Sequence, residues 1–399
     1  MLDTPLTLSS GAVIKNRIVK AAMSDGLADS KNHATEQHCR LYRRWSEGGA
    51  GLLIIGEVQV DYRHLERPGN IALDRPGGIK TLRAMTTAGT VAGNHLWAQL
   101  GHAGALTFPE INSTPLAPSA VPVRGNHPRA MTGSDIHKLI ARYADAAAIS
   151  REAGFTGIEI HAAHGFLLSQ FLSPRFNQRA DDWGGSLENR ARLLLEIVRA
   201  VRTKIGDDYP IAVKLNASDF QEGGFSFAES QQVSRWLDRE HIDLLSISGR
   251  IHKSDEDDGT DQTRSAGNLA HEAYFLDYAS TIKKTINTPV MVTGGFRSCA
   301  GIMHAFEQGI DLVGLARPLV VDAELPRKLI AGTINTCPRV EDRFSNDLPL
   351  GAGTAWFQMQ IIRMGNDKHV DLSISPEKAL EMIIEFDRKA ARKYSRDLA

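Results

Sequence analysis

The sequence has few cysteines, and none of them forms a CxxC pair. Cys39, Cys299 and Cys337 are the only three among 399 residues, and they lie far apart in the chain. An iron–sulfur cluster or a thiolate zinc site normally takes ligands from closely spaced cysteines. The cysteine pattern therefore excludes metal sites of both kinds that use adjacent thiolates.

Long apolar runs and an excess of one charge are also missing. No apolar run approaches the ~18 residues of a membrane span, and the N-terminal segment lacks the apolar core of a signal peptide. Forty-six basic residues balance 47 acidic ones, which gives a net charge of −1. This balance argues against a nucleic-acid or membrane-surface binder that relies on bulk charge. We predict a cytoplasmic protein without either kind of partner.

Strand-like and helix-like segments alternate along the chain. Hydrophobic residues make up 42% and charged residues 23%, which is typical of a globular protein with a sizeable core. Nearly continuous apolar runs are typical of strands that are covered on both faces. The eight expected strands are Arg17–Ala22, Gly51–Val58, Leu96–Leu100, Gly157–His161, Ile211–Asn216, Leu244–Ser248, Pro289–Thr293 and Asp311–Leu315.

Amphipathic stretches between these strands predict helices. They are Glu36–Glu47, Gly78–Ala92, Asp135–Ala153, Ser186–Ile205, Ala228–Glu240, His271–Ile286, Cys299–Gln308 and Glu324–Ile330, with Ser186 as an expected N-cap. Eight such units predict an α/β fold of the (β/α)8 TIM-barrel type, which usually needs ~250 residues plus insertions. A doubly wound sheet is the alternative.

Two segments fall outside the repeating units. The proline-rich insert Thr107–Met131 follows the third strand and is expected either to cap the barrel mouth or to form a hairpin. Asn335–Asp371 has weak periodicity, and Pro376–Tyr394 predicts a last helix. Because no linker or repeat is evident, we predict one domain over residues 1–399, with a core at about 8–330 and a C-terminal extension at 331–399.

Polar residues at the C-terminal ends of barrel strands usually face the active site. The last two strands end in Gly294-Gly295 and in Ala316-Arg317. Phosphate sites in such barrels use these two loops, where glycine admits backbone N–H groups and a helix N-terminus adds its dipole. The alternative is a plain turn with a surface ion pair. We favour a phosphate site because both features occur in the right pair of loops.

Three polar residues on the fourth and fifth strands carry the remaining chemistry. His161 and His164 end the fourth strand. They could be half of a zinc site, ordinary core histidines, or two N–H donors that polarise a carbonyl or phenolate oxygen. Lys214 lies in an apolar strand, where it needs an anionic partner. A salt bridge to Glu159 or Asp219 is one option, and a cofactor that becomes anionic, such as a reduced flavin, is the other.

Five segments together resemble the old yellow enzyme family of FMN-dependent NAD(P)H:flavin oxidoreductases. They are KNRIVKAAMS (15–24), AQLGHAG (98–104), IHAAHGFLLSQFLSPRFNQRADDWGGSLENR (160–190), VTGGFRS (292–298) and LARPLVVDAELPRKL (315–329). The matches run in the correct order from about Leu8 to Ile330. The resemblance implies a (β/α)8 barrel with a non-covalent FMN across its mouth, which a nicotinamide reduces and an electron-poor alkene reoxidises.

The resemblance also implies roles for individual residues. Ala21, Ala22, Met23, Ser24 and Glu57 would line the flavin ring, with Ser24 near its N5/O4 edge. Gln99 would bind the pyrimidine, and Lys214 would stabilise negative charge at N1/O2. The phosphate would be held by Gly294, Gly295, Ala316 and Arg317. His161 and His164 would hold the substrate carbonyl during hydride transfer to the β-carbon.

The chain departs from the family pattern at several positions. Phe166 stands where the family usually has a proton-donating tyrosine, and phenylalanine has no proton to transfer. Lys214 replaces a common arginine and Ala316 a common glycine, and both changes look tolerable. The cysteine-rich cluster and second nucleotide domain of the dienoyl-CoA reductase branch are missing, so electrons are expected directly from NAD(P)H.

The sequence therefore predicts an ene-reductase with a ping-pong reaction. A nitro- or quinone-reductase on the same scaffold is the alternative, because those acceptors need no proton from the missing tyrosine. A flavin-binding redox sensor with little turnover and, more remotely, a metal hydrolase remain as other classes. The expected partners are small molecules, and a homo-oligomer is compatible with the sequence.

Overall fold

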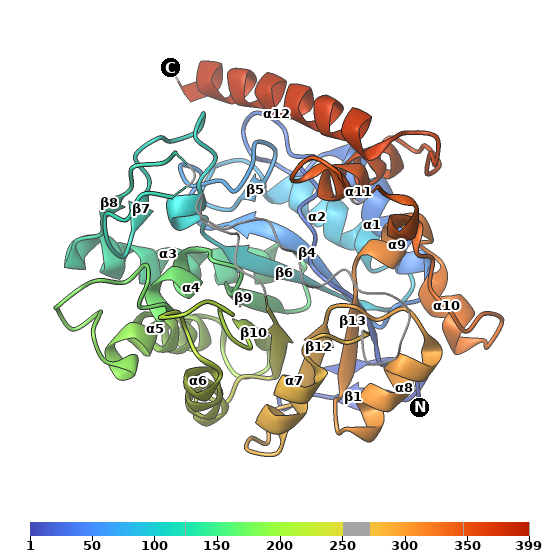
Figure 1. Ribbon diagram of the computed structural model, residues 1–399, viewed down its shortest axis with the longest axis horizontal. Helices are drawn as coiled ribbons and strands as arrows, with labels where there is room; N and C mark the ends of the chain where they lie inside the picture. The colour runs from blue at the N-terminus through green and yellow to red at the C-terminus, as the bar shows by residue number, and fades with distance from the viewer. Residues whose placement is uncertain (124, 250–271, 346, 399) are drawn as a thin grey trace.

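The computed structural model describes residues 1–123, 125–249, 272–345 and 347–398, and all their side chains except those of 57 and 395–398. Eight parallel strands form its centre (Figure 1). They are β3 (Ile18–Lys20), β4 (Leu52–Gln59), β6 (His95–Gly101), β9 (Ile158–Ala162), β10 (Ile211–Asn216), β11 (Leu244–Ser248), β12 (Val290–Thr293) and β13 (Leu312–Leu315). All eight predicted strands are confirmed.

The sheet closes on itself because β3 pairs with both β4 and β13. Val19 is in register with Leu52 on one side, and Ile18 with Val313 on the other. A doubly wound sheet would have two free edges, so this alternative is wrong and the (β/α)8 barrel is confirmed. A short strand, β5 (Ile71–Ala72), adds to the end of β4.

Helices surround the barrel where the amphipathic stretches predict them (Figure 1). They are α1 (Glu36–Glu47), α2 (Ile79–Gly89), α3 (Gly133–Glu152), α5 (Leu187–Ile205), α6 (Phe227–Arg239), α7 (Leu276–Lys283), α8 (Cys299–Glu307) and α10 (Leu325–Ile330). Ser186 caps α5 as predicted, since its Oγ accepts the N–H of Asn189 at 3.3 Å. The predicted start of the seventh helix, His271, lies outside the described residues.

The barrel interior is apolar at its N-terminal end. A buried cluster contains inward-facing residues from seven of the eight strands, together with Leu8 and Ile14. Strand β4 contributes two residues to it, and the other six strands contribute one each. Leu8 and Ile14 flank or belong to an N-terminal hairpin, β1 (Leu6–Thr7) and β2 (Val13–Ile14), which closes the floor of the barrel. The floor of the barrel is therefore apolar.

The insert after β6 packs onto the loop that follows β4. The Phe108 N–H donates to Leu65 O at 2.9 Å, and the Leu116 N–H donates to His64 Nε2 at 3.1 Å. Its two strands, β7 (116–117) and β8 (129–130), pair in parallel. The hairpin alternative is therefore wrong, since a hairpin needs antiparallel strands. The insert covers this side of the mouth.

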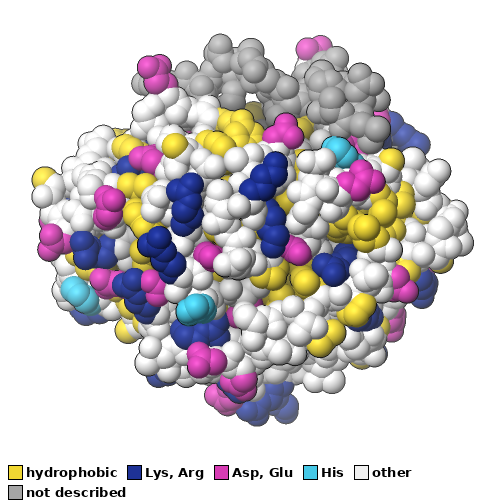
Figure 2. All heavy atoms as spheres, turned by 90° about the horizontal axis from the view of Figure 1, so that it is seen from below, with side chains coloured by type: hydrophobic (Ala, Val, Ile, Leu, Met, Phe, Trp, Pro, Cys, Tyr) yellow, Lys and Arg dark blue, Asp and Glu magenta, His cyan; other side chains and the backbone are white. Residues whose placement is uncertain are grey.

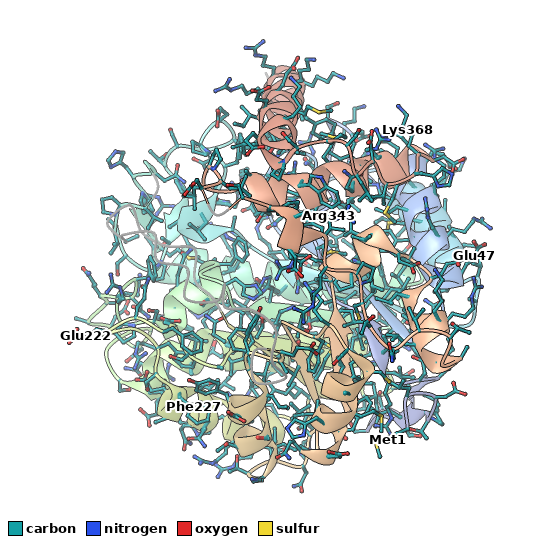
Figure 3. All side chains as sticks on the ribbon, turned by 45° about the vertical axis from the view of Figure 1, so that its right-hand side comes forward. Met1, Glu47, Glu222, Phe227, Arg343 and Lys368 are labelled. Carbon is teal, nitrogen blue, oxygen red and sulfur yellow. The ribbon has the colours of Figure 1, made fainter. Side chains whose placement is uncertain are left out.

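The C-terminal extension adds two helices. The sequence predicts α12 (Pro376–Leu398) but not α11 (Ala352–Gly365), and two further helices, α4 (Leu167–Leu172) and α9 (Arg317–Val321), are also unpredicted. In Figure 1, α12 runs along the edge of the molecule above β4 and β5. Figure 3 shows Lys368, beyond α11, on the same side as Glu47 at the end of α1. The one-domain division stays a prediction.

Surface charge is mixed, as the balanced composition suggests. Figure 2 shows a face where basic and acidic side chains alternate without a continuous patch of one sign. Among the helices that the structure describes, none has the length and apolar character to cross a membrane.

Candidate active site

The polar centre of the mouth is built by three adjacent strands. Lys214 of β10 is in register with His161 of β9 and with Ser246 of β11. Ala212 belongs to the inner cluster, and side chains alternate along a strand, so Lys214 also points into the barrel. The predicted histidine and lysine therefore stand at the same level inside the mouth.

Lys214 is buried, yet neither predicted partner pairs with it. The side chain is 3% exposed, and within the described part of the chain it forms no ion pair with Glu159 or Asp219. Glu159 instead accepts a hydrogen bond from Gln99 Nε2 at 2.6 Å, and Asp219 accepts the Phe225 N–H at 2.8 Å. A salt bridge from Lys214 to either of these two carboxylates is therefore wrong.

Several polar atoms in the same interior lack hydrogen-bond partners. They are Glu159 Oε1, Ser246 Oγ and Thr293 Oγ1, each buried. Unpaired buried polar groups are costly and usually mark a position that a ligand or water completes. The ammonium of Lys214 and the two hydroxyl groups suit an anionic part of a ligand, whereas Glu159 Oε1 requires a hydrogen-bond donor.

His161 and His164 lie together at the end of β9. Their rings are 5.0 Å apart and nearly perpendicular. His161 Nδ1 accepts the Ala163 N–H at 3.3 Å, so a neutral ring carries its proton on Nε2. His164 Nε2 lies 2.9 Å from Ser248 Oγ, and its backbone has φ +61°, a left-handed conformation unusual for histidine. Both histidines are therefore oriented by hydrogen-bond contacts, which distinguishes them from core histidines that are held by apolar packing alone.

The His161 ring is neutral over the ordinary pH range. Burial, followed by the nearby Lys214 ammonium, lowers the pKa of His161 to about 3, against an opposing effect of Glu159. A neutral imidazole can donate one hydrogen bond without a net charge of its own. His161 is thus suited to stabilise an oxyanion as a fixed donor.

Phe166 occupies a buried position beside the first histidine. Its side chain is 5% exposed, and its ring lies 5.1 Å from that of His161 in an edge arrangement. Phe166 is also the N-cap residue of α4. The substitution thus places an apolar ring where the family usually has a phenol.

The predicted ring-lining residues of β3 and β6 converge on Gly56. A Cβ at Gly56 would lie 2.8 Å from Ala22 Cβ, 3.1 Å from Gln99 Oε1 and 3.1 Å from the Met23 nitrogen. Glycine is required by this close approach. Ala21 is buried, whereas Ala22, Met23 and Ser24 are half-buried and border the mouth. Glu57 lies in the adjoining β4, and its side chain is outside the described set.

The predicted phosphate loops also come together, at the ends of β12 and β13. Gly294 and Gly295 have φ of +134° and +82°, and a Cβ at Gly295 would lie 2.8 Å from the Ala273 nitrogen. Ala316 precedes Arg317, which begins α9 and is 47% exposed in its side chain. Glycine turns with positive φ beside an arginine suit a phosphate group.

Two carboxylates alter the expected electrostatics of this corner. Glu272 Oε2 accepts hydrogen bonds from the Arg297 N–H, the Ser298 N–H and Ser298 Oγ at 2.9–3.1 Å. Glu272 therefore already accepts hydrogen bonds just before the start of α8, and the contribution of a helix N-terminus to a phosphate site stays a prediction. Glu341 of the extension pairs with Arg297 and lies 4.0 Å from Arg317.

One group of side chains in the described residues has the spacing of a metal site, but its hydrogen bonds do not suit a metal ion. In the described ranges, one group of three side chains has ligand atoms close enough for an ion: Asp61, His64 and His102. His64 Nε2 accepts the Leu116 N–H and His102 Nδ1 accepts the Gly104 N–H, so each neutral ring carries its proton on the nitrogen that faces the cluster. Arg63 also binds both oxygens of Asp61. His161 and His164 are not part of this group.

Sequence reasoning missed some members of the site. Glu159 was considered only as a partner for Lys214, although it contacts Gln99, and Ser248 was noted only as a strand end. Glu66 and Asn70 were not identified, because they lie in a loop beyond β4 without a catalytic motif. Reading the whole loop after each strand could have found them.

The fold is a (β/α)8 barrel whose mouth holds a buried lysine beside a pair of histidines. A profile of the NADH:flavin oxidoreductase / NADH oxidase family matches residues 1–335. The chain therefore belongs to this family, which confirms the predicted resemblance and FMN as the cofactor, with a nicotinamide as reductant.

Individual relatives agree with this assignment. The NADH-dependent flavin oxidoreductase iliE of Neonectria sp. (strain DH2) is 33% identical over 93% of this chain and 52% of its own length. A 2-naphthoyl-CoA reductase structure is 26% identical over 95% of this chain and 57% of its own, with a TM-score of 0.79. An old yellow enzyme homologue of Zymomonas mobilis shares the fold at 24% identity, with a TM-score of 0.72 over 88% of this chain and 99% of its own. The chain thus spans little more than half the length of the first two.

Proposed function

We propose that this chain is an FMN-dependent oxidoreductase that takes hydride from NADH or NADPH and reduces the activated C=C bond of an α,β-unsaturated carbonyl compound by a ping-pong mechanism. The observation that carries the proposal is the pair His161 and His164, whose rings meet at 5.0 Å beside the buried Lys214. The substrates are proposed to be small molecules, without nucleic-acid or membrane partners.

The barrel mouth supplies the groups that hold the cofactor. FMN, when bound, accepts hydride from the nicotinamide and passes it to the second substrate. Lys214 would stabilise negative charge on the ring, and Gln99, fixed by Glu159, would bind its pyrimidine edge. The remaining proposed contacts are Ala21, Ala22, Met23, Ser24 and Glu57 for the ring, and Gly294, Gly295, Ala316 and Arg317 for the phosphate.

The histidine pair would act on the substrate carbonyl. Hydride addition at the β-carbon moves negative charge to the carbonyl oxygen, and two fixed N–H donors lower the energy of that charge. Neutral His161 suits this role because it needs no proton exchange with solvent. Phe166 beside it cannot protonate the α-carbon, so water or another residue must do so.

Quinone or nitro reduction is the second candidate, and Phe166 favours it. These acceptors take up hydride or electrons without protonation at carbon, so an apolar ring beside His161 does not hinder them. The rates at which alkenes and quinones reoxidise the reduced enzyme separate the two candidate functions. Rapid reoxidation by quinones alone would favour the second.

A phenol test examines the histidine pair directly. A para-substituted phenol should bind the FMN-loaded enzyme as phenolate and give a long-wavelength charge-transfer band. His161→Ala and His164→Ala should each weaken phenol affinity at least tenfold, and should slow alkene reduction more than reduction by NAD(P)H. His33→Ala, in a loop beside α2, is the control. Unchanged phenol affinity in both variants would reject the role.

A further inference from the structure

Ser24 at the end of β3 donates its hydroxyl proton to a carboxylate. Ser24 Oγ donates to Glu66 Oε2 at 2.7 Å, and Asn70 Nδ2 donates to Ser24 Oγ at 3.3 Å. A serine hydroxyl has one proton and two acceptor sites. The Ser24 proton is therefore directed at Glu66 and is not available to a ligand at the mouth.

This arrangement is fixed by the tight packing of two loops. The Ala28 N–H donates to Gly69 O at 2.9 Å, and a Cβ at Gly69 would lie 2.5 Å from Gly26 O. Asn70 is buried, and its Oδ1 accepts the Arg67 N–H at 2.9 Å. Since the loop after β3 cannot shift without the loop after β4, Glu66 stays within reach of Ser24.

The outer side of the second loop is held by the C-terminal helix. Arg67 Nη2 donates to Asp387 Oδ1 of α12 at 2.7 Å, and Tyr394 Oη donates to Tyr62 O at 2.6 Å. The backbone of Ser24 forms an isolated parallel β-bridge with that of Gly56. Gly56 is the glycine that Ala22 and Gln99 approach closely. The hydrogen bond between Ser24 and Glu66 thus lies at the rim of the proposed flavin site.

We propose that Glu66 is a positioning residue that holds the Ser24 hydroxyl proton away from the flavin O4 and thereby lowers the flavin's tendency to be reduced. The inference rests on the proposed function, in which Ser24 borders the N5/O4 edge. Reduction adds two electrons to the ring and increases negative charge on its carbonyl oxygens. A hydroxyl group that donates a hydrogen bond to such an oxygen favours the reduced form. Glu66 prevents this because it accepts the Ser24 hydroxyl proton itself.

The test is the reduction equilibrium of the FMN-loaded enzyme against a redox dye of known potential. Xanthine oxidase with xanthine delivers the electrons to flavin and dye under anaerobic conditions. Glu66→Gln weakens the acceptor and releases the Ser24 proton, so the equilibrium constant should shift about tenfold toward reduced flavin. For a two-electron couple, tenfold corresponds to about 30 mV.

A second substitution separates the hydrogen bond from a simple charge effect. Ser24→Ala in the Glu66→Gln background should reverse the shift, whereas Ser24→Ala alone should change the equilibrium less than threefold. Glu110→Gln removes an exposed charge on a neighbouring loop and is the control, with no shift expected. A Glu66→Gln shift that persists without Ser24 would overturn the inference, and so would no shift at all.

Two further outcomes complete the design. If Glu66→Gln does not fold, Glu66→Asp keeps the charge but draws the carboxylate away from Ser24, and a two- to threefold shift toward reduced flavin is expected. An unshifted equilibrium in a folded Glu66→Asp would then reject the inference. Failure of the wild-type chain to retain FMN would instead contradict the proposed function.

Discussion

Arg317 is half-exposed at the start of α9, where Glu341 approaches it only to 4.0 Å. If it binds the FMN phosphate, Arg317→Ala removes a charge-assisted hydrogen bond that contributes about 1.5–3 kcal/mol. We expect FMN to dissociate at least tenfold more readily, as measured by flavin fluorescence on dilution, and FMN rather than FAD to be released on denaturation. Arg339→Ala, which removes a partner of Glu272, should retain the flavin.

Phe166 provides the test of the missing proton donor. Phe166→Tyr adds one hydroxyl to a ring that touches His161, and general acids contribute ~10²–10⁴-fold when their step limits the rate. The variant should therefore reduce simple enones faster while quinone turnover changes little. Steady-state rates with both acceptors measure this ratio. An unchanged ratio in a folded, flavin-bound variant would show that protonation here does not limit turnover.

Lys20 is a buried cation on the outer side of the barrel wall. It is fully buried, donates to Ile54 O at 3.0 Å and lies 4.4 Å from the centre of the Trp45 ring, and burial lowers its pKa to about 7. An unfolded lysine titrates near 10.4, so between pH 7 and 10 the unfolded state binds more protons and stability rises with pH. Lys20→Met should be on the order of 1–3 kcal/mol more stable at pH 7.

Thermal unfolding at several pH values checks this expectation. The difference between Lys20→Met and the wild type should be largest at pH 7 and shrink toward pH 10, because the wild-type lysine is neutral in both states at high pH. Parallel pH profiles for the two proteins would contradict the assignment of the slope to Lys20.

Among the elements, α12 is linked to the loop after β4 by a buried ion pair. Arg67 is 3% exposed in its side chain, and its Nε and Nη1 have no hydrogen-bond partner, so Asp387 is its principal anchor. Removing one member of a buried pair typically costs 3–5 kcal/mol. We expect Asp387→Ala to lower the free energy of unfolding in urea by about 3 kcal/mol. Asp277→Ala, in α7 away from this pair, should cost much less.

The elements differ in how well the sequence predicts them. The eight strands follow from apolar runs such as Leu244–Ser248, because burial on both faces leaves a pattern that needs no tertiary information. The helix α11 was not predicted, since ten of its residues are buried all round and no polar face produces a period. The parallel pairing of 116–117 with 129–130 depends on contacts with the barrel, which local sequence does not encode.

The site shows the same division. Residues at strand ends, such as His161 and Lys214, could be predicted because a barrel brings those ends to one mouth. The contacts of Glu66 with Ser24 and of Ser248 with His164 could not, since they join loops and strands through side-chain geometry. Glu341 near Arg317 and Glu272 near the start of α8 could not be predicted either, because neither belongs to a recognised sequence motif.

At the scale of the whole molecule, the barrel separates an apolar floor from a polar mouth. Leu8 and Ile14 close the floor together with inward residues such as Trp97, while Lys214 and His161 stand at the other end of the same strands. The apolar floor leaves the mouth as the end of the barrel with groups that suit a polar ligand. This separation strengthens electrostatic interactions at the mouth.

The closure of β3 onto β13 has a consequence for how the protein is made. Ile18 pairs with Val313, so the first and last strands of the barrel meet only after almost 300 intervening residues have left the ribosome. At ~5–20 residues per second, synthesis of that span takes roughly 15–60 s. Throughout that time β3 presents an unpaired edge on one side, and unpaired edges invite pairing with other chains. Slow translation or heat during expression should therefore favour aggregation of the nascent chain, and a chaperone that shields the early strands should raise the yield.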